Sequence, residues 1–217
     1  KITFGDEVDF CVPTGNFGDI LAGYYAKQMG LPVGRLVCAS NQNNVLTDFL
    51  STGTYTAKRE FYKTTSPSMD ILVSSNLERL LYHVSGSSEK VAGWMQELSA
   101  TGKYTVDAET LAKIQQSFAA GYADDADGAA EIKARFDGDP YLCDTHTAVA
   151  FHVAAQKKRD GVPMVVLSTA SPFKFPRSVL EALGHTAPEN DFEAMQALEE
   201  ATGRTAPASL AALRQKA

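Results

Sequence analysis

The chain has 217 residues, of which 44% are hydrophobic and 21% charged, and 26 acidic against 20 basic side chains give it a formal net charge of −6. This composition is typical of a globular protein with one large domain or two small ones. The acidic balance excludes an ordinary nucleic-acid-binding protein, and no apolar run approaches the roughly 20 residues of a membrane span. Three widely spaced cysteines, without a Cys-x-x-Cys, predict no disulfide framework, no metal site and a cytoplasmic location. The chain opens at Lys1 without a methionine or a secretory signal, so we expect a piece of a larger protein.

The first 40 residues predict a strand, a glycine-bearing turn, a helix and a second strand. Residues 8–12 form a short apolar run, as a buried parallel strand should, and residues 35–39 form another. Between them, large side chains recur at helical spacing over residues 21–29, and Gly30 ends the helix. This order is a βαβ unit, which predicts a parallel sheet with a right-handed crossover.

The middle of the chain is predicted to be mostly helical, with residues 71–73 as a possible strand. We interpret residues 76–140 as a mostly helical insertion between strands of one sheet, in preference to a second independent domain. The helices expected in this part of the chain span residues 43–51, 76–85, 89–100, 107–119 and 126–136.

The strand–helix alternation returns near Asp144, which together with Thr145 can cap an alanine-rich helix that ends at about residue 158. Residues 162–167 predict a buried strand, followed directly by Ser168 and Thr169. Three more helices are expected, over residues 176–183, 191–202 and 207–215. The whole pattern predicts an α/β fold.

The turn after the first strand is the strongest candidate for a ligand site. Gly15 and Gly18 let backbone N–H groups approach an anion, and the helix that begins near Asp19 adds unpaired amides and a positive dipole end. A phosphate group is therefore the expected ligand. Asp19 stands where a Walker loop needs lysine, and neither a third glycine nor an acid after the second strand completes a dinucleotide fingerprint. The alternative is a tight strand–helix connection that binds nothing.

The sequence around this turn, Val-Pro-Thr-Gly-Asn-Phe-Gly-Asp-Ile-Leu-Ala-Gly over residues 12–23, closely resembles the phosphate loop of threonine synthase, a fold-type-II pyridoxal-phosphate enzyme. Four more motifs resemble that family in the same order, so the resemblance covers about residues 8–183. Two departures are Thr145, where the family often has proline, and Ser171, where it often has histidine. The four motifs are residues 41–44, 67–71, 144–149 and 168–175.

The resemblance implies a three-layer αβα domain that binds pyridoxal 5′-phosphate (PLP), with residues 1–217 as the C-terminal part of the large domain. It also implies the lyase reaction of threonine biosynthesis, in which O-phospho-L-homoserine and water give L-threonine and phosphate. The Schiff-base lysine of that family lies in a Phe-Lys-Asp motif before the glycine turn, and no such motif precedes Gly15 in this chain. We therefore expect the C-terminal half of a threonine synthase, inactive by itself, with no catalytic residue of its own.

The resemblance also assigns candidate site residues. The turn is expected to hold the cofactor phosphate, with Asp19 capping or turned away, and Thr169 is expected to donate a hydrogen bond to the pyridine nitrogen. Weaker candidates for substrate contact are Asn41, Asn43, His146 and Lys174, which could equally be turn residues, a helix cap and a solvated lysine. A different function remains open, a non-catalytic module that binds a phosphate ligand on the same scaffold. A Phe-Lys-Asp motif upstream of Lys1 in the reading frame would favour the enzyme. The expected cofactor-binding residues are Gly15, Asn16, Phe17, Gly18, Asp19 and Thr169.

Overall fold

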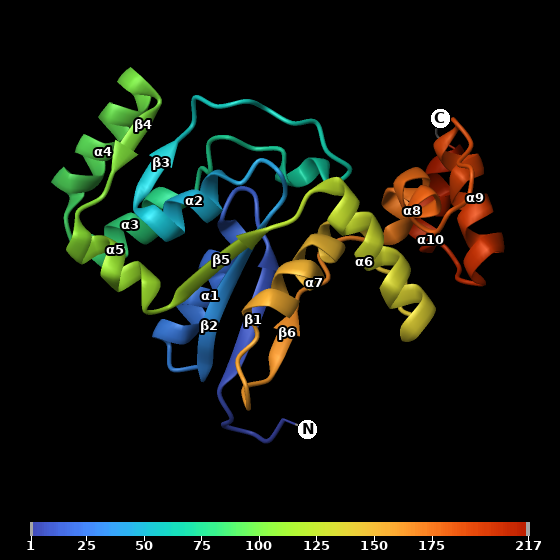
Figure 1. The fold of residues 1–217 in the computed structure, drawn as a ribbon, viewed down its shortest axis with the longest axis horizontal. Coiled ribbons are helices and arrows are strands. Elements are labelled where there is room, and N and C mark those ends of the chain that lie inside the picture. Colours follow the sequence, from blue (N-terminus) through green and yellow to red (C-terminus); the bar gives the residue numbers. More distant parts are fainter. Residues whose placement is uncertain (1, 216–217) are drawn as a thin grey trace.

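The computed structural model describes residues 2–215, and its centre is a sheet of four parallel strands in the order β5-β2-β1-β6 (Figure 1). Every ladder in this sheet is parallel, as the βαβ pattern predicts. The turn after β1 therefore lies at the same edge as the ends of the other three strands. The strands are β1 (Val8–Pro13), β2 (Val33–Ser40), β5 (Phe118–Tyr122) and β6 (Met164–Val166).

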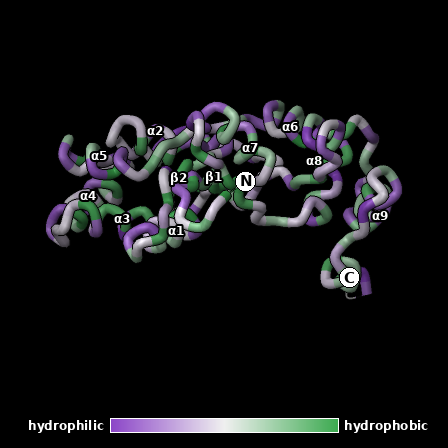
Figure 2. The backbone as a smooth tube through the Cα atoms, turned by 90° about the horizontal axis from the view of Figure 1, so that it is seen from below, coloured by the Kyte–Doolittle hydropathy of each residue, from purple (hydrophilic) through white to green (hydrophobic). Residues whose placement is uncertain are grey.

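Helices cover both faces of the sheet, which confirms the predicted three-layer α/β fold. The helices α1 (Gly18–Gln28) and α2 (Val45–Thr52) pack on one face, and α7 (Thr145–Lys157) packs on the other. Figure 2 shows β1 and β2 between α1 and α7. Because side chains alternate along a strand, Leu36 joins the core beneath α1 and α2 while its neighbour Val37 joins the core beneath α7.

Two smaller groups of elements flank the sheet at opposite ends (Figure 1). One contains an antiparallel strand pair with three helices, and the other contains a separate apolar core formed largely by the C-terminal helices. The first group is β3 (Thr54–Thr56), α3 (Leu77–Ser85), α4 (Ser88–Thr101), β4 (Lys103–Thr105) and α5 (Ala108–Gln115). The second group is α6 (Asp125–Gly138), α8 (Pro176–Ala182), α9 (Asp191–Thr202) and α10 (Ala208–Ala211). Short 3-10 helices are η1 (Pro67–Met69), η2 (Pro172–Lys174) and η3 (Ala212–Gln215).

The structure corrects two predicted elements in the middle of the chain. The helix expected over residues 107–119 ends at Gln115, because Phe118 begins β5 and pairs with Leu36 of β2. Residues 71–73 are not a strand, and the carbonyl of Leu72 instead accepts a hydrogen bond from the Tyr55 hydroxyl. The stretch 76–140 thus contains β4 and β5, and the chain rejoins the main sheet at β5.

The last predicted strand is also corrected. It spans Met164–Val166, which is shorter than the expected 162–167, and all of its residues are half-buried. Among the described residues, β6 pairs with β1 alone and forms an edge of the sheet, so it lacks the second neighbour that would bury it.

Candidate functional site: the turn between β1 and α1

The turn between β1 and α1 is built around a phenylalanine in the left-handed region. Phe17 has φ 68° and ψ 2°, and Gly18 begins α1 directly after it. The Phe17 side chain is fully buried, and its ring lies 5.6 Å from the ring of Phe118 on β5. The side chain of Phe17 therefore cannot contact a ligand.

The carbonyl groups of the turn point toward the segment that leads into α3. The carbonyl of Gly15 accepts from Ser74 Oγ at 2.9 Å, and the carbonyl of Asn16 accepts from the backbone N of Asn76 at 3.1 Å and from its Nδ2 at 3.0 Å. Since N–H and C=O point in opposite directions in a trans peptide, the amides of Asn16 and Phe17 point away from that segment. Within residues 2–215, the amides of Gly15, Asn16 and Phe17 have no hydrogen-bond acceptor.

This turn fits a phosphate group. Adjacent unpaired amides at a left-handed residue before a helix form a concave anion site, and the positive end of the helix dipole adds to it. The Gly18 amide donates to Asn16 Oδ1 at 2.9 Å, so a neutral side-chain oxygen already accepts there. Asp19 is exposed, and its carboxylate has no hydrogen-bond or ion-pair partner in the described part of the chain. Of the two arrangements predicted for Asp19, the structure shows the one without capping.

Gly15 is required by close packing behind the turn. A Cβ atom at this position would lie 2.9 Å from the carbonyl oxygen of Ser68 and 3.1 Å from the Cα atom of Met69. A Cβ atom on Gly18 would meet only side-chain atoms, at 3.2 Å from Asn16 Oδ1 and 3.3 Å from Asn76 Nδ2. The turn is thus pressed against the backbone of η1.

Asn41 and Asn43 lie at the end of β2 and are almost completely buried. The Nδ2 atoms of both donate to Asp70 Oδ1, at 2.8 Å from Asn41 and 2.9 Å from Asn43. Asn43 also exchanges two hydrogen bonds with the backbone of Tyr62. These side chains hold the segment between β3 and η1 against the sheet edge, and their contact with a substrate stays a prediction.

His146 lies in the first turn of α7 and is 3% exposed. Its Nδ1 lies 3.0 Å from Asp144 Oδ1, and its Nε2 accepts from the Ser68 amide at 3.2 Å. Asp144 also caps α7 by accepting from the amides of His146 and Thr147, as predicted. Burial raises the pKa of Asp144, but hydrogen bonds from His146 and Thr147 outweigh it and leave the pKa below its usual value.

Thr169 and Lys174 follow β6 and are both exposed. The amide of Leu167 donates to the carbonyl of Cys11 on β1 at 2.9 Å. The chain therefore leaves the sheet just before Thr169, next to β1, which leads into the glycine turn. The Thr169 hydroxyl has no hydrogen-bond partner in the part of the chain described. The Nζ of Lys174 lies 5.5 Å from the ring centroid of Phe175, whose ring is 4.8 Å from that of His146.

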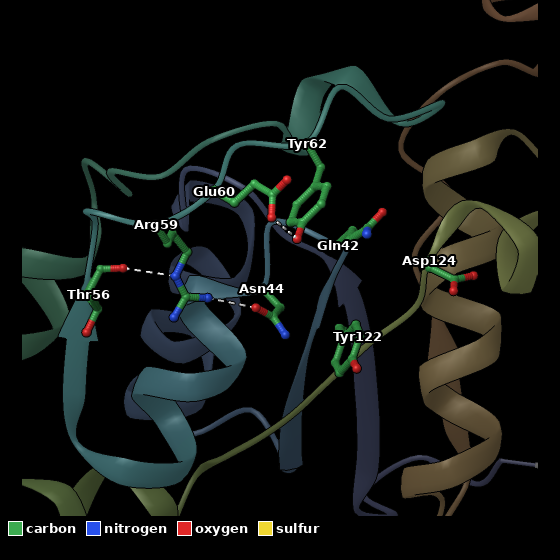
Figure 3. Close-up of a pocket in the computed structure, with 8 residues that line it drawn as sticks. All are labelled: Gln42, Asn44, Thr56, Arg59, Glu60, Tyr62, Tyr122 and Asp124. Carbon is green, nitrogen blue, oxygen red and sulfur yellow. Dashed lines mark hydrogen bonds between the residues drawn. The ribbon is translucent and has the colours of Figure 1, made fainter.

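A separate hollow of about 450 Å³ lies past the ends of β2 and β5 (Figure 3). Its one basic lining residue, Arg59, donates to Asn44, to the carbonyl of Thr56 and to the carboxylate of Asp48. The carboxylates of Glu60 and Asp124 also line it (Figure 3). An anion would meet no unpaired positive charge there, so the glycine turn is the better phosphate site.

The sequence patterns did not identify the residues that orient the turn, Ser74 and Asn76. Asn76 directly precedes α3 and therefore has the position of a helix cap, but its side chain makes no capping bond. It donates to the carbonyl of Asn16 instead. A polar residue before a helix signals a cap, and nothing in the local pattern indicates a partner so distant in the chain.

Across residues 2–215, no helix has the length and apolar character needed to cross a membrane.

The chain is similar to threonine synthases in sequence and in structure. A family model described as "Threonine synthase, C-terminal" matches residues 147–216. Threonine synthase-like 1 of Pongo abelii is 41% identical over 84% of this chain and 25% of the relative. Threonine synthase of Methylobacillus glycogenes is 40% identical over 82% of this chain and 39% of the relative. The crystal structure of PLP-bound threonine synthase from Brucella melitensis superposes with a TM-score of 0.82 at 43% identity, over 89% of this chain and 42% of that one. The chain thus spans well under half the length of each of these proteins.

Proposed function

Because the chain is a relative of the threonine synthases that corresponds to a C-terminal portion of them, we propose that it forms the phosphate-holding part of a PLP site. The observation that carries the proposal is the set of unpaired amides at Gly15, Asn16 and Phe17, of which those of Asn16 and Phe17 face away from the segment that binds the carbonyls of Gly15 and Asn16. These amides and the start of α1 would hold the phosphate of the cofactor. The crystal structure of the Brucella relative is named as PLP-bound, which supports the choice of ligand.

Thr169 would face the other end of the cofactor in this proposal. Its exposed hydroxyl lies after β6, at the sheet edge that also carries the turn. A hydroxyl can donate to an unprotonated pyridine nitrogen, but it does not keep that nitrogen protonated as a carboxylate would. When bound, the cofactor supplies an electron sink for proton transfers on an amino-acid substrate. A threonine at this position makes the sink milder, which suits elimination and replacement at the side chain.

For the whole protein we propose the threonine synthase reaction. The C–O bond between Cγ and the phosphate of O-phospho-L-homoserine breaks, one proton is lost from Cβ and one is added at Cγ. Water then adds its hydroxyl at Cβ and its remaining proton goes to the solvent or the released phosphate, so the products are L-threonine and inorganic phosphate. On the substrate side, Lys174 could pair with the substrate phosphate, while the His146 ring nitrogens are held by Asp144 and Ser68. The Schiff-base lysine is proposed to lie outside these 217 residues.

One experiment tests the enzyme against the non-catalytic module. PLP and O-phospho-L-homoserine are added to the protein from the complete reading frame and, in parallel, to the 217-residue chain, and threonine is measured by chromatography. We expect threonine from the complete protein alone, and no lysine of the shorter chain fixed to the cofactor by borohydride. Phosphate-ligand binding by the complete protein without any threonine would favour the module. Stoichiometric fixation on Lys174 would contradict an external lysine.

A further inference from the structure

The peptide between Asn16 and Phe17 is held in one of two orientations that a turn can adopt. The angles of Phe17, φ 68° and ψ 2°, match the third residue of a type II turn. In a type I turn the same residue has negative φ, and the central peptide is reversed. A side chain other than glycine disfavours the left-handed region, so an unrestrained Asn16–Phe17 peptide would tend to reverse.

Reversal of this peptide would destroy the anion site. It would put the carbonyl of Asn16 where the amide of Phe17 now points, and a carbonyl oxygen repels a phosphate. The orientation seen is fixed by two hydrogen bonds from one residue, since the backbone N and the Nδ2 of Asn76 both donate to the Asn16 carbonyl. Ser74 restrains the preceding peptide through the Gly15 carbonyl.

We propose that Asn76 is a positioning residue for the phosphate site, which keeps the Phe17 amide directed at the ligand. This inference rests on the proposed function of the turn. A capping role does not account for the side chain, because Asn76 makes no side-chain cap bond to α3. Asn190, which precedes α9, shows the contrast, since its Oδ1 accepts from the amides of Phe192 and Glu193.

The test compares Asn76→Ser with Asn190→Ser. Serine remains a good cap at both positions but is too short to reach the Asn16 carbonyl from position 76. Inorganic phosphate is titrated into ¹⁵N-labelled protein, and the amide signals of residues 15–19 are followed by NMR. Unfolding midpoints are measured in urea. We expect Asn76→Ser to weaken phosphate binding by on the order of 3- to 10-fold, as the loss of one orienting hydrogen bond predicts, and Asn190→Ser to leave it unchanged.

The outcomes separate this inference from the function on which it rests. If phosphate moves no amide signal of residues 15–19 in the unaltered protein, the proposed function of the turn is wrong, and this inference with it. If the unaltered protein binds phosphate there and folded Asn76→Ser binds equally well, the positioning role alone is overturned. Should Asn76→Ser fail to fold, Asn76→Asp gives the same decision, because it keeps the shape of the side chain but replaces the Nδ2 donor to the Asn16 carbonyl with an oxygen. Restored binding in Asn76→Gln, which keeps the amide donor, would support positioning over a general effect on stability.

Discussion

The backbone amide of Ser68 donates to Nε2 of His146 at 3.2 Å and joins η1 to the first turn of α7. Because Nε2 accepts this bond, the proton of a neutral imidazole lies on Nδ1, where it is donated to Asp144 Oδ1 at 3.0 Å. The carbonyl of the same Ser68 would lie 2.9 Å from a Cβ atom on Gly15. A buried Asp–His pair at the N-terminus of α7 therefore supports the back of the glycine turn through a single residue of η1.

The buried carboxylate of Asp144 should make a measurable, pH-dependent contribution to stability. We expect Asp144→Asn to lower the free energy of unfolding by about 1.5–3 kcal/mol at pH 7, because several donors lose a charged acceptor. The pKa of Asp144 is lowered in the folded protein, so its stabilisation is complete above an unfolded pKa of about 3.9 and is lost as pH falls through the lower folded value. The difference in the free energy of unfolding between the variant and the unaltered protein, measured in urea, should thus become smaller below about pH 4.

The control for this measurement is Asp124→Asn, at the exposed N-cap of α6. Asparagine caps a helix about as well as aspartate, so we expect a change within about 0.5 kcal/mol. Equal losses in the two variants would show that Asp144 is only an ordinary helix cap.

The two glycines of the turn should differ in their tolerance of a methyl group. Gly15→Ala places Cβ against backbone atoms of Ser68 and Met69, which cannot move independently, and should cost about 1–3 kcal/mol of stability. Gly18→Ala meets only movable side-chain atoms and favours the helix, so we expect a change below about 1 kcal/mol. Urea denaturation of the two variants decides this, and a larger loss in Gly18→Ala would contradict the packing described for η1.

Charge at position 16 should control phosphate affinity. Asn16→Asp puts a negative oxygen at the mouth of the turn, and we expect phosphate affinity to fall on the order of tenfold at low salt and by less at high salt. Asn16→Ala frees the Gly18 amide from its side-chain acceptor and should retain or improve affinity. Isothermal titration with inorganic phosphate measures both. Similar losses in the two variants would mean that Asn16 itself binds the ligand through its side chain.

The hydroxyl of Thr169 is tested in the protein from the complete reading frame. Thr169→Val should weaken PLP binding and slow turnover, each by about 1–3 kcal/mol, because the proposed hydrogen bond to the ring would be lost. Ser168→Ala, at the exposed neighbouring position, should change neither. Unchanged cofactor affinity in Thr169→Val, measured by equilibrium dialysis, would remove Thr169 from the site.

The parts of the fold that follow local rules were predictable from the sequence. The βαβ unit around Gly15 and the cap at Asp144 are both confirmed, because strand, turn and cap signals act over a few residues. The strand β5 was not predicted, since Phe118 directly follows a helical pattern and becomes a strand by pairing with Leu36. Tertiary contacts of that kind override local preference.

The residues that orient the glycine turn were less predictable from the sequence than the turn itself. The glycine pattern identified the turn, but the orientation of its peptides depends on Asn76, whose bonding partner is a backbone carbonyl. Backbone carbonyls occur at every position, so no residue pattern indicates which one a distant asparagine will bind. Asn41 and Asn43 show the same limit, because their partner Asp70 follows a long irregular segment.

The place of β1 in the sheet predicts an order for assembly of the site during folding. Its Val8 pairs with Val33 on the nearby β2, whereas its Asp9 pairs with Met164 on β6 and binds Arg159, which is 150 positions away. Contacts between distant residues require closure of a long loop, and they form slowly. The turn and its Asn76 support belong to the part of the chain that can form first, and Thr169 arrives only when β6 docks. If the turn binds phosphate as proposed, a refolding chain should recover affinity for inorganic phosphate before it can bind both ends of a cofactor.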